Sequence, residues 1–328
     1  MHPHRICRTR RAALASTLLF GLPRLAPAQA AWPERPITLV VPFGPGGIAD
    51  LTARSVAQAM SATLKVPIVV DNKPSAGSIV GSAAVAHAAP DGYTLLLMSN
   101  ANAVSAGLFR KLPFDVQKDF APVGTLGVFD LALFVGADSK LKSVRELLAE
   151  AKARPGKLTI GTIAVGSTQH LSAELFKSRT GIDALIVPYK SSPAVLTALR
   201  SGEIDAAFEI LGPMLPQLQA KAVRALAVTS DRRFATLPEV PTMREAGVAD
   251  YEVASWNALA APAKTPPAVI DRLNAAANDA LRNPAVQDKL LSLGVRAQGG
   301  TPAQLRTLLA AEIRHWGEVI RAAKIEPE

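Results

Sequence analysis

A strand that runs into a glycine-rich loop and then a helix, over residues 37–64, constrains the fold of this chain more than any other feature. Residues 37–41 read Ile-Thr-Leu-Val-Val, without the regular alternation of a strand with one wet face. Such a strand is typically covered by helices on both faces. In the loop, Gly46 and Gly47 allow positive φ and close approach of a ligand to the backbone. The helix that follows begins with unpaired N–H groups and a positive dipole end, so the stretch predicts an anion-binding loop in an α/β fold.

Short apolar strands and helical segments continue to alternate along the chain, which predicts βαβ units and a mostly parallel sheet. Two longer apolar stretches, residues 120–135 and 251–261, are candidates for extended segments that cross between domains. We therefore predict two α/β domains, each a mostly parallel sheet flanked by helices, with a ligand site between them. Domain 1 comprises residues 31–127 and 253–328, and domain 2 comprises residues 128–252.

The first 30 residues have the pattern of a secretory signal peptide. Basic residues extend to Arg11, an apolar run covers residues 12–22, and a small-x-small cleavage site ends at Ala30. The apolar run is too short for a transmembrane helix, which needs about 20 residues. Cleavage near Ala30 removes the only cysteine, Cys7. We therefore expect an exported protein that has neither disulfides nor thiol chemistry.

Removal of the signal peptide also changes the charge of the chain. It takes away five of the 36 basic residues and none of the 27 acidic ones, which lowers the formal net charge from +9 to +4. The basic balance is thus partly a property of the targeting segment. Because aromatic residues are also sparse, we expect no nucleic-acid partner.

The loop itself leaves two readings open. Residues Gly44 to Ala49 fit the dinucleotide fingerprint G-x-G-x-x-G/A, and Asp71 follows at about the expected distance. This reading predicts an exported dinucleotide-dependent oxidoreductase. Against it, Pro45 fixes φ inside the tight turn, and soluble nicotinamide cofactors are not expected outside the cytoplasm. The P-loop pattern fails because no Lys-Ser/Thr follows the glycines, and the hydrolase motifs G-x-S-x-G and H-E-x-x-H do not occur.

A series of motifs resembles the periplasmic solute-binding receptors of the tripartite tricarboxylate transporter family, also called Bug receptors. The likeness covers nearly the whole predicted mature chain. In order, the motifs are A-W-P-E-R-P-I-T-L-V-V-P-F-G-P-G-G-I-A-D, V-V-D-N-K-P-S-A-G, A-A-P-D-G-Y-T-L-L-L, K-L-P-F-D-V-Q-K-D-F, P-G-K-L, G-S-T-Q-H-L-S-A-E-L-F, V-P-Y-K, R-A-L-A-V-T-S, L-P-E-V-P-T-M-R-E-A-G and E-I-R-H-W.

The resemblance implies a type II Venus-flytrap fold and a receptor without catalysis or cofactor. It would clamp a small carboxylate (a dicarboxylate or tricarboxylate, an acidic amino acid or an aromatic acid) between its domains and deliver it to an inner-membrane permease. We expect a monomer. Backbone N–H groups, hydroxyls and waters would hold the carboxylate. The residues implied are Phe43, Gly46, Gly47 and Asp50 in the first loop, Ser99, Asn100, Ala101 and Asn102 in the second, Gly166, Ser167, Thr168 and His170 in the third, Ser191, and Asp205 near the floor.

Several of these residues also have a purely structural reading. Ser167 and Thr168 are typical N-cap residues, and Asp50 favours the first turn of a helix. If Asp50 meets a ligand, it would act through water or on an amino group, since a bare aspartate repels a carboxylate. Asp205 reads equally well as a turn residue. His170 is far in sequence from the other histidines, so we expect no metal site.

The chain departs from the family pattern after Tyr189-Lys190, where relatives have a glycine and one more residue before the next proline. Here Ser191 and Ser192 precede Pro193. Either Ser191 donates a hydrogen bond where relatives offer backbone, or the shorter loop retreats from the site.

Overall fold

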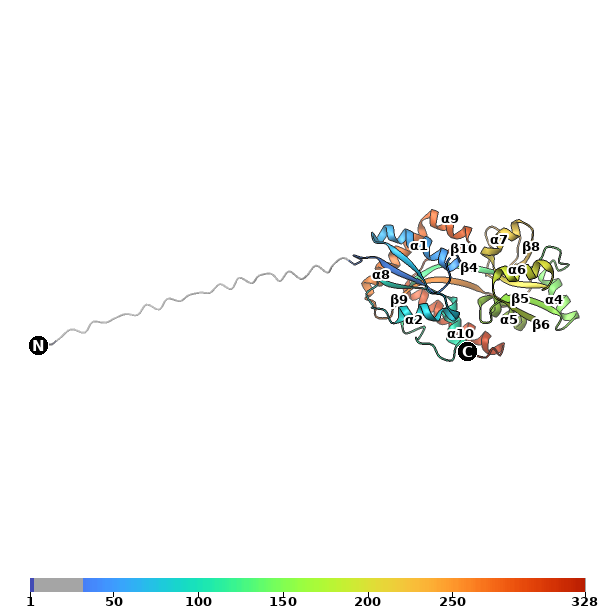
Figure 1. The fold of residues 1–328 in the computed structure, drawn as a ribbon, viewed down its shortest axis with the longest axis horizontal. Coiled ribbons are helices and arrows are strands. Elements are labelled where there is room, and N and C mark those ends of the chain that lie inside the picture. Colours follow the sequence, from blue (N-terminus) through green and yellow to red (C-terminus); the bar gives the residue numbers. More distant parts are fainter. Residues whose placement is uncertain (3–31, 328) are drawn as a thin grey trace.

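The computed structural model describes residues 1–2 and 32–327, so the predicted signal peptide lies outside the described residues apart from its first two positions. From Trp32 onward the chain forms two lobes that lie side by side (Figure 1). Lobe 1 contains β1 (Ile37–Val41), α1 (Ile48–Leu64), β2 (Ile68–Asn72), the 3-10 turn η1 (Ala76–Ser78), α2 (Ile79–Ala86), β3 (Thr94–Ser99), α3 (Asn100–Leu108), β9 (Ala254–Pro262), α8 (Pro267–Arg282), α9 (Pro284–Ser292), β10 (Val295–Ala297) and α10 (Pro302–Ala322). Lobe 2 contains α4 (Val144–Ala153), β5 (Leu158–Ile163), α5 (Thr168–Thr180), β6 (Ala184–Tyr189), α6 (Ser192–Ser201), β7 (Ala206–Ile210), α7 (Leu211–Gln219) and β8 (Val223–Val228).

The long strand β4 (Phe120–Gly136) belongs to both lobes. It pairs with β9 as far as Asp130 and with β7 from Leu131 onward. The resulting strand order is β2-β1-β3-β9-β4-β7-β5-β6, with β8 and β10 also paired to β4. The chain thus changes strand partners after Asp130 and returns through β9, and the division into two domains with the stated bounds stays a prediction.

The sheet is mixed in both lobes. The predicted parallel pairing is present where β1 lies between β2 and β3, and where β5 lies between β6 and β7. All pairs made by β4 and β9 are antiparallel. Because these two strands connect the lobes, each lobe contains more antiparallel pairing than the alternation of strands and helices predicts.

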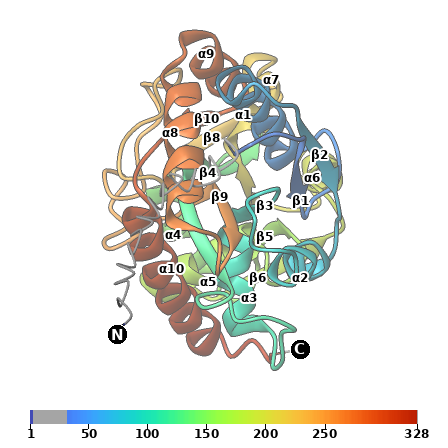
Figure 2. The same cartoon turned by 90° about the vertical axis from the view of Figure 1, so that its left-hand side faces the viewer.

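Helices cover both faces of the sheet in lobe 1, as the unbroken apolar strands require. Leu95 and Leu97 of β3 pack on the side of α1 and α8, whereas Leu96 and Met98 pack toward α3 and α10. Figure 2 shows α1, α8 and α9 on one side of this sheet and α2, α3 and α10 on the other. Among the described residues, no helix combines the length and apolar character needed to cross a bilayer.

The two connections between the lobes are tied together by Thr229. Its N–H donates to Leu131 of β4 at 2.9 Å, and its carbonyl accepts from Val253, just before β9, at 2.9 Å. Its hydroxyl lies 2.6 Å from the Val253 carbonyl oxygen. Thr229 is fully buried. The lobes thus meet at a hydrogen-bonded pair of extended segments.

The strand directions decide which loops face the other lobe. The carboxyl ends of β1 and β3 in lobe 1 point toward the carboxyl ends of β5, β6 and β7 in lobe 2 (Figure 1). Helices α1, α3, α5 and α6 begin at these ends. We call the region where these loops meet the junction. Ligands of open α/β sheets bind at the carboxyl ends of strands, so the junction is the place to look for a site.

Candidate functional site

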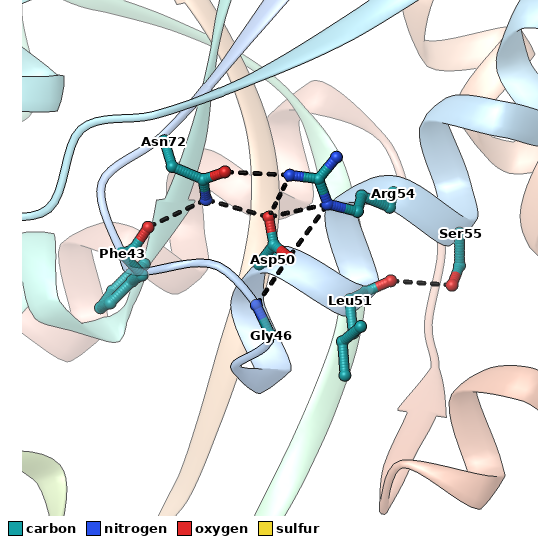
Figure 3. Close-up of polar contacts among 7 residues, drawn as sticks. All are labelled: Phe43, Gly46, Asp50, Leu51, Arg54, Ser55 and Asn72. Carbon is teal, nitrogen blue, oxygen red and sulfur yellow. Dashed lines mark hydrogen bonds and ion pairs between the residues drawn. The ribbon is translucent and has the colours of Figure 1, made fainter.

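The loop between β1 and α1 is held in shape by the carboxylate of Asp50 (Figure 3). Asp50 Oδ2 accepts from the Gly46 N–H at 2.9 Å, and Oδ1 accepts from Asn72 Nδ2 at 2.9 Å. Arg54 Nε lies 3.0 Å from both carboxylate oxygens. Asn72 Nδ2 also donates to the Phe43 carbonyl at 3.0 Å. Asp50 is only 2% exposed, and these contacts join both ends of the loop to helix α1 and strand β2.

Burial alone would raise the pKa of Asp50. Hydrogen bonds from Arg54, Gly46 and Asn72, together with the charge of Arg54, outweigh burial and hold this pKa below its ordinary value. Asp50 is therefore ionised at neutral pH, and both of its oxygens are already hydrogen-bonded to protein groups. Its visible role is to fix the loop, and its contact with a solute stays a prediction.

The first turn of α1 is open toward the junction. Gly47 is the N-cap and provides no side-chain hydrogen bond, and residues 44–47 are exposed. Gly46 has φ +81°, and a Cβ added there would meet no atom within 4 Å. The N–H groups of the first helical turn thus have no capping side chain, and the preceding loop is exposed, which suits an anion.

The second and third predicted loops meet directly. Asn100, the first residue of α3, donates from Nδ2 to Thr168 Oγ1, the first residue of α5, at 3.0 Å. Asn100 Oδ1 accepts from Trp316 Nε1 at 2.8 Å, and the same Nε1 lies 2.8 Å from Glu312 Oε2. This network joins lobe 2 to lobe 1 at the junction. Two loops that are far apart in sequence are therefore brought together as predicted.

A glycine of the third loop makes a close contact between the lobes. Gly166 has φ +78°, and a Cβ added there would lie 2.2 Å from Leu108 Cδ2, on α3 of lobe 1. Both the backbone conformation and the close approach require glycine here.

Several predicted residues act as helix caps. Ser99 accepts from the Ala101 N–H, and Asn102 Oδ1 accepts from the Ser99 N–H, which forms a capping box on α3. Ser167 Oγ accepts from the His170 N–H at 3.1 Å and caps α5. These contacts match the structural reading of the side chains. A direct role of these residues in ligand binding stays a prediction.

Ser191 precedes α6 without capping it. It is exposed, and no side-chain hydrogen bond caps this helix. The start of α6 thus resembles that of α1, with first-turn N–H groups that no side chain caps.

Two predicted residues fit the site less well. Asp205 precedes β7, at the opposite end of that strand from the junction, and its Oδ2 accepts from the N–H and hydroxyl of Thr159, both at 2.8 Å. The structure therefore does not place Asp205 at the floor of the site, because the full length of β7 separates this residue from the junction. His170 lies in the first turn of α5 and is 7% exposed. Burial, with a smaller effect from the charge of Lys177, lowers its pKa.

Two buried polar residues at the junction were not predicted. Glu209 is the last residue but one of the apolar strand β7, at the carboxyl end, whereas Asp205 precedes the strand at its other end. Asn257 of β9 is opposite Ser99 of β3, is fully buried, and neither its Oδ1 nor its Nδ2 has a hydrogen-bond partner among the described residues. The sequence signal that could have identified Glu209 and Asn257 is an acidic or amide residue within an otherwise apolar strand.

The chemistry of the junction favours binding of a small polar molecule over metal or dinucleotide chemistry. Among the described residues, no group of three or more His, Cys, Asp or Glu side chains is placed to hold a metal ion. Asp50 lies buried beneath the glycine loop and is paired with Arg54 at 3.0 Å. Asp71 pairs with Lys73 at 3.0 Å in an exposed position.

Comparison with known proteins agrees with this arrangement. Residues 52–325 match the family model for the tripartite tricarboxylate transporter family receptor. The chain is 38% identical to the protein BugT of Bordetella pertussis over 292 residues, which cover 88% of this chain and 90% of BugT.

Two solved structures with bound carboxylates are also similar. Rpa4515 of R. palustris with adipate is 36% identical, with a TM-score of 0.81, and the match covers 90% of this chain and all of that one. MatC (Rpa3494) from Rhodopseudomonas palustris with bound malate is 32% identical, with a TM-score of 0.76, over 88% of this chain and all of that one. These relatives are solute-binding receptors and not enzymes, so the oxidoreductase alternative is not supported.

Proposed function

Because the chain belongs to the tripartite tricarboxylate transporter receptor family, we propose that it binds a small carboxylate at the junction and closes around it. The observation that carries this proposal is the convergence of helix N-termini, including those of α1, α3, α5 and α6, on the junction. Each presents the positive end of a helix dipole. Relatives with bound adipate and malate support the ligand class.

The proposed mode of binding uses backbone donors. The first turns of α1 and α6 lack side-chain caps. In α6, Pro193 has no N–H and the Ala194 N–H donates to the Ser191 carbonyl at 3.1 Å, so the donor proposed there is the Ser192 N–H. These starts lie on different lobes, at the ends of β1 and β6. A solute with two polar ends would contact one helix start in each lobe, which gives it a higher affinity for the closed form and shifts the equilibrium toward closure.

Contacts between the lobes describe what closure would require. The Asn100–Thr168 hydrogen bond and the packing of Gly166 near Leu108 both join lobe 1 to lobe 2. Opening about the segments near Thr229 would break them. In the closed form, contacts between the solute and both lobes would therefore add to these direct contacts between the lobes.

The same family membership supports a periplasmic receptor that delivers its solute to an inner-membrane permease. Export through a cleaved signal peptide ending near Ala30 fits this location. We propose that the mature chain acts as a monomer, because one copy contains both lobes of the site.

The proposal is tested by thermal unfolding of residues 31–328 with a panel of dicarboxylates, tricarboxylates, acidic amino acids and aromatic carboxylates. A ligand at 100 times its Kd stabilises the folded state by about 2.7 kcal/mol, which is visible as a higher midpoint. Stabilisation by at least one carboxylate is expected. If no carboxylate in the panel raises the midpoint, the proposed function is wrong.

Substitutions then locate the site for any carboxylate that binds. Asp50→Ala is expected to weaken binding by loosening the glycine loop, and Ser167→Ala by removing the cap of α5. Normal binding by both variants would show that the solute sits elsewhere.

A further inference from the structure

Glu209 is a buried carboxyl group for which the proposed binding mode gives no reason. It is 1% exposed, although no ion pair among the described residues includes it. Buried acids without a cationic partner are uncommon and tend to mark functional positions.

The two oxygens of Glu209 have different surroundings. Oε2 accepts from Ser192 Oγ at 2.8 Å, from Gln169 Nε2 at 3.3 Å and from the Ile210 N–H at 3.3 Å. Oε1 is buried and has no hydrogen-bond partner among the described residues. A buried acceptor without a partner is unfavourable, so this oxygen would gain from a donor that a solute group or a bound water supplies.

The position of Glu209 places this free oxygen at the proposed solute site. Ser192 is the first residue of α6 and Gln169 is the second residue of α5, so the carboxyl group lies between two of the helix starts that converge on the junction. The next residue, Ile210, packs against the apolar cluster shared by α1 and α8 in lobe 1. Glu209 is therefore held by lobe 2 at the point where the lobes meet.

The surroundings of Glu209 favour a hydrogen-bond acceptor. Burial raises the pKa of its carboxyl group, while the hydrogen bonds from Ser192, Gln169 and Ile210 oppose that rise. The positive ends of the nearby helices also favour the ionised form. An ionised carboxylate accepts hydrogen bonds and repels a second carboxylate.

We propose that Glu209 Oε1 accepts a hydrogen bond from a hydroxyl or ammonium group of the solute, so that the receptor selects carboxylates that carry such a donor. The inference rests on the proposed function and narrows its ligand class. A plain dicarboxylate leaves Oε1 without a partner, whereas a hydroxy or amino acid of the same skeleton provides one.

The wild-type chain tests this inference with matched ligands in isothermal titration calorimetry. One set is succinate, L-malate and L-aspartate, and the other is adipate, 2-hydroxyadipate and 2-aminoadipate. In at least one set, a donor-bearing member is expected to bind at least about tenfold more tightly than the plain diacid, as for a hydrogen bond to a charged group. If the plain diacid binds as tightly as its hydroxy and amino counterparts, or more tightly, in every set with measurable binding, this inference is wrong and the proposed function still stands. If no member of either set binds, this inference is wrong whatever other carboxylates the panel identifies.

The variant Glu209→Gln identifies the group responsible. Three donors surround the Oε2 position, so the amide oxygen of glutamine must sit there, and its NH₂ group takes the Oε1 position. The acceptor offered to the solute thus becomes a donor. The preference for the hydroxy or amino ligand is expected to disappear or reverse, with a larger loss for aspartate than for malate if the ammonium group is the donor.

Glu239→Gln is the matched control, because it removes the same charge from an exposed loop of lobe 2. It is expected to leave the ligand preference unchanged. Thermal unfolding without ligand is the measurement that checks whether Glu209→Gln is folded. An unchanged ligand preference in folded Glu209→Gln would overturn the assignment of Glu209 as the acceptor. If plain diacids also bound this variant no more weakly than they bind wild type, the result would further exclude a protonated Glu209 that donates to a solute carboxylate.

Discussion

Replacement of Asp50 by asparagine tests whether this carboxylate shapes the glycine loop. Donors surround both oxygens: Gly46 N–H at Oδ2, Asn72 Nδ2 at Oδ1, and Arg54 Nε near each. In either orientation, the NH₂ group of asparagine would face a donor. Asn72 cannot turn over to relieve this, because its Oδ1 accepts from Arg54 and its Nδ2 also donates to the Phe43 carbonyl.

The expected loss follows from these contacts. One hydrogen bond disappears and a buried donor is left unpaired, which costs about 1–3 kcal/mol. The lost attraction to Arg54 adds no more than roughly 0.5 kcal/mol, because that side chain is 49% exposed and well solvated. A total of about 1–3.5 kcal/mol lowers the midpoint of thermal unfolding by about 2–14 °C in a chain of this size.

The assay is thermal unfolding of residues 31–328 followed by circular dichroism. Asp71→Asn, next to Asn72 on β2, is the control, since it removes only an exposed ion pair with Lys73 and is expected to change stability by less than about 0.5 kcal/mol. If Asp50→Asn and Asp71→Asn unfold at the same temperature, the loop does not depend on Asp50 and the reasoning is refuted.

Three further predictions concern closure and pH. Gly166→Ala places a methyl group against Leu108 of the other lobe and is expected to weaken carboxylate binding about tenfold, whereas Gly181→Ala, also at positive φ but with nothing within 4 Å, leaves the Kd unchanged in calorimetry. The folded-state pKa of Asp50 is lowered, so the stability advantage of wild type over Asp50→Asn is complete above the ordinary carboxyl pKa near 4. This advantage is lost as the pH falls through the lowered pKa, and urea titrations at several pH values measure the loss. The folded-state pKa of Glu209 is raised, so its contribution to stability has the opposite pH dependence. In the same titrations, wild type is expected to lose stability relative to Glu209→Gln as the pH rises from about 4.5 through the raised pKa. A stability difference that stays constant with pH would contradict the burial argument.

The strands with unbroken apolar runs could be predicted closely from the sequence. Strand β1 has the predicted bounds, residues 37–41, because turn residues follow the apolar run. Helix α7 was not predicted, since it contains Pro213 and Pro216, yet a proline near a helix start is tolerated. Strand β10 is only three residues long and depends on its pairing with β4. These elements depend on tertiary contacts more than on local pattern.

The candidate site was predictable where it follows a strand and precedes a helix. Asn100 and Thr168 come from such loops, and the structure brings them together. Glu209 was missed because its partners lie 17 and 40 residues away in the chain, at Ser192 and Gln169. Asp205 was placed wrongly although the parallel pairing of β7 with β5 puts the residue before β7 at the far end of the sheet.

The central claim is that a carboxylate binds at the junction, between the two lobes. A crystal structure of residues 31–328 with the most stabilising carboxylate tests it directly. We predict carboxylate oxygens within hydrogen-bond distance of first-turn N–H groups of α1 or α6, with both lobes in contact with the solute. A solute bound instead in the hollow of about 1290 Å³ lined by residues such as Lys142, Leu215 and Pro241, away from these helix starts, would contradict the account.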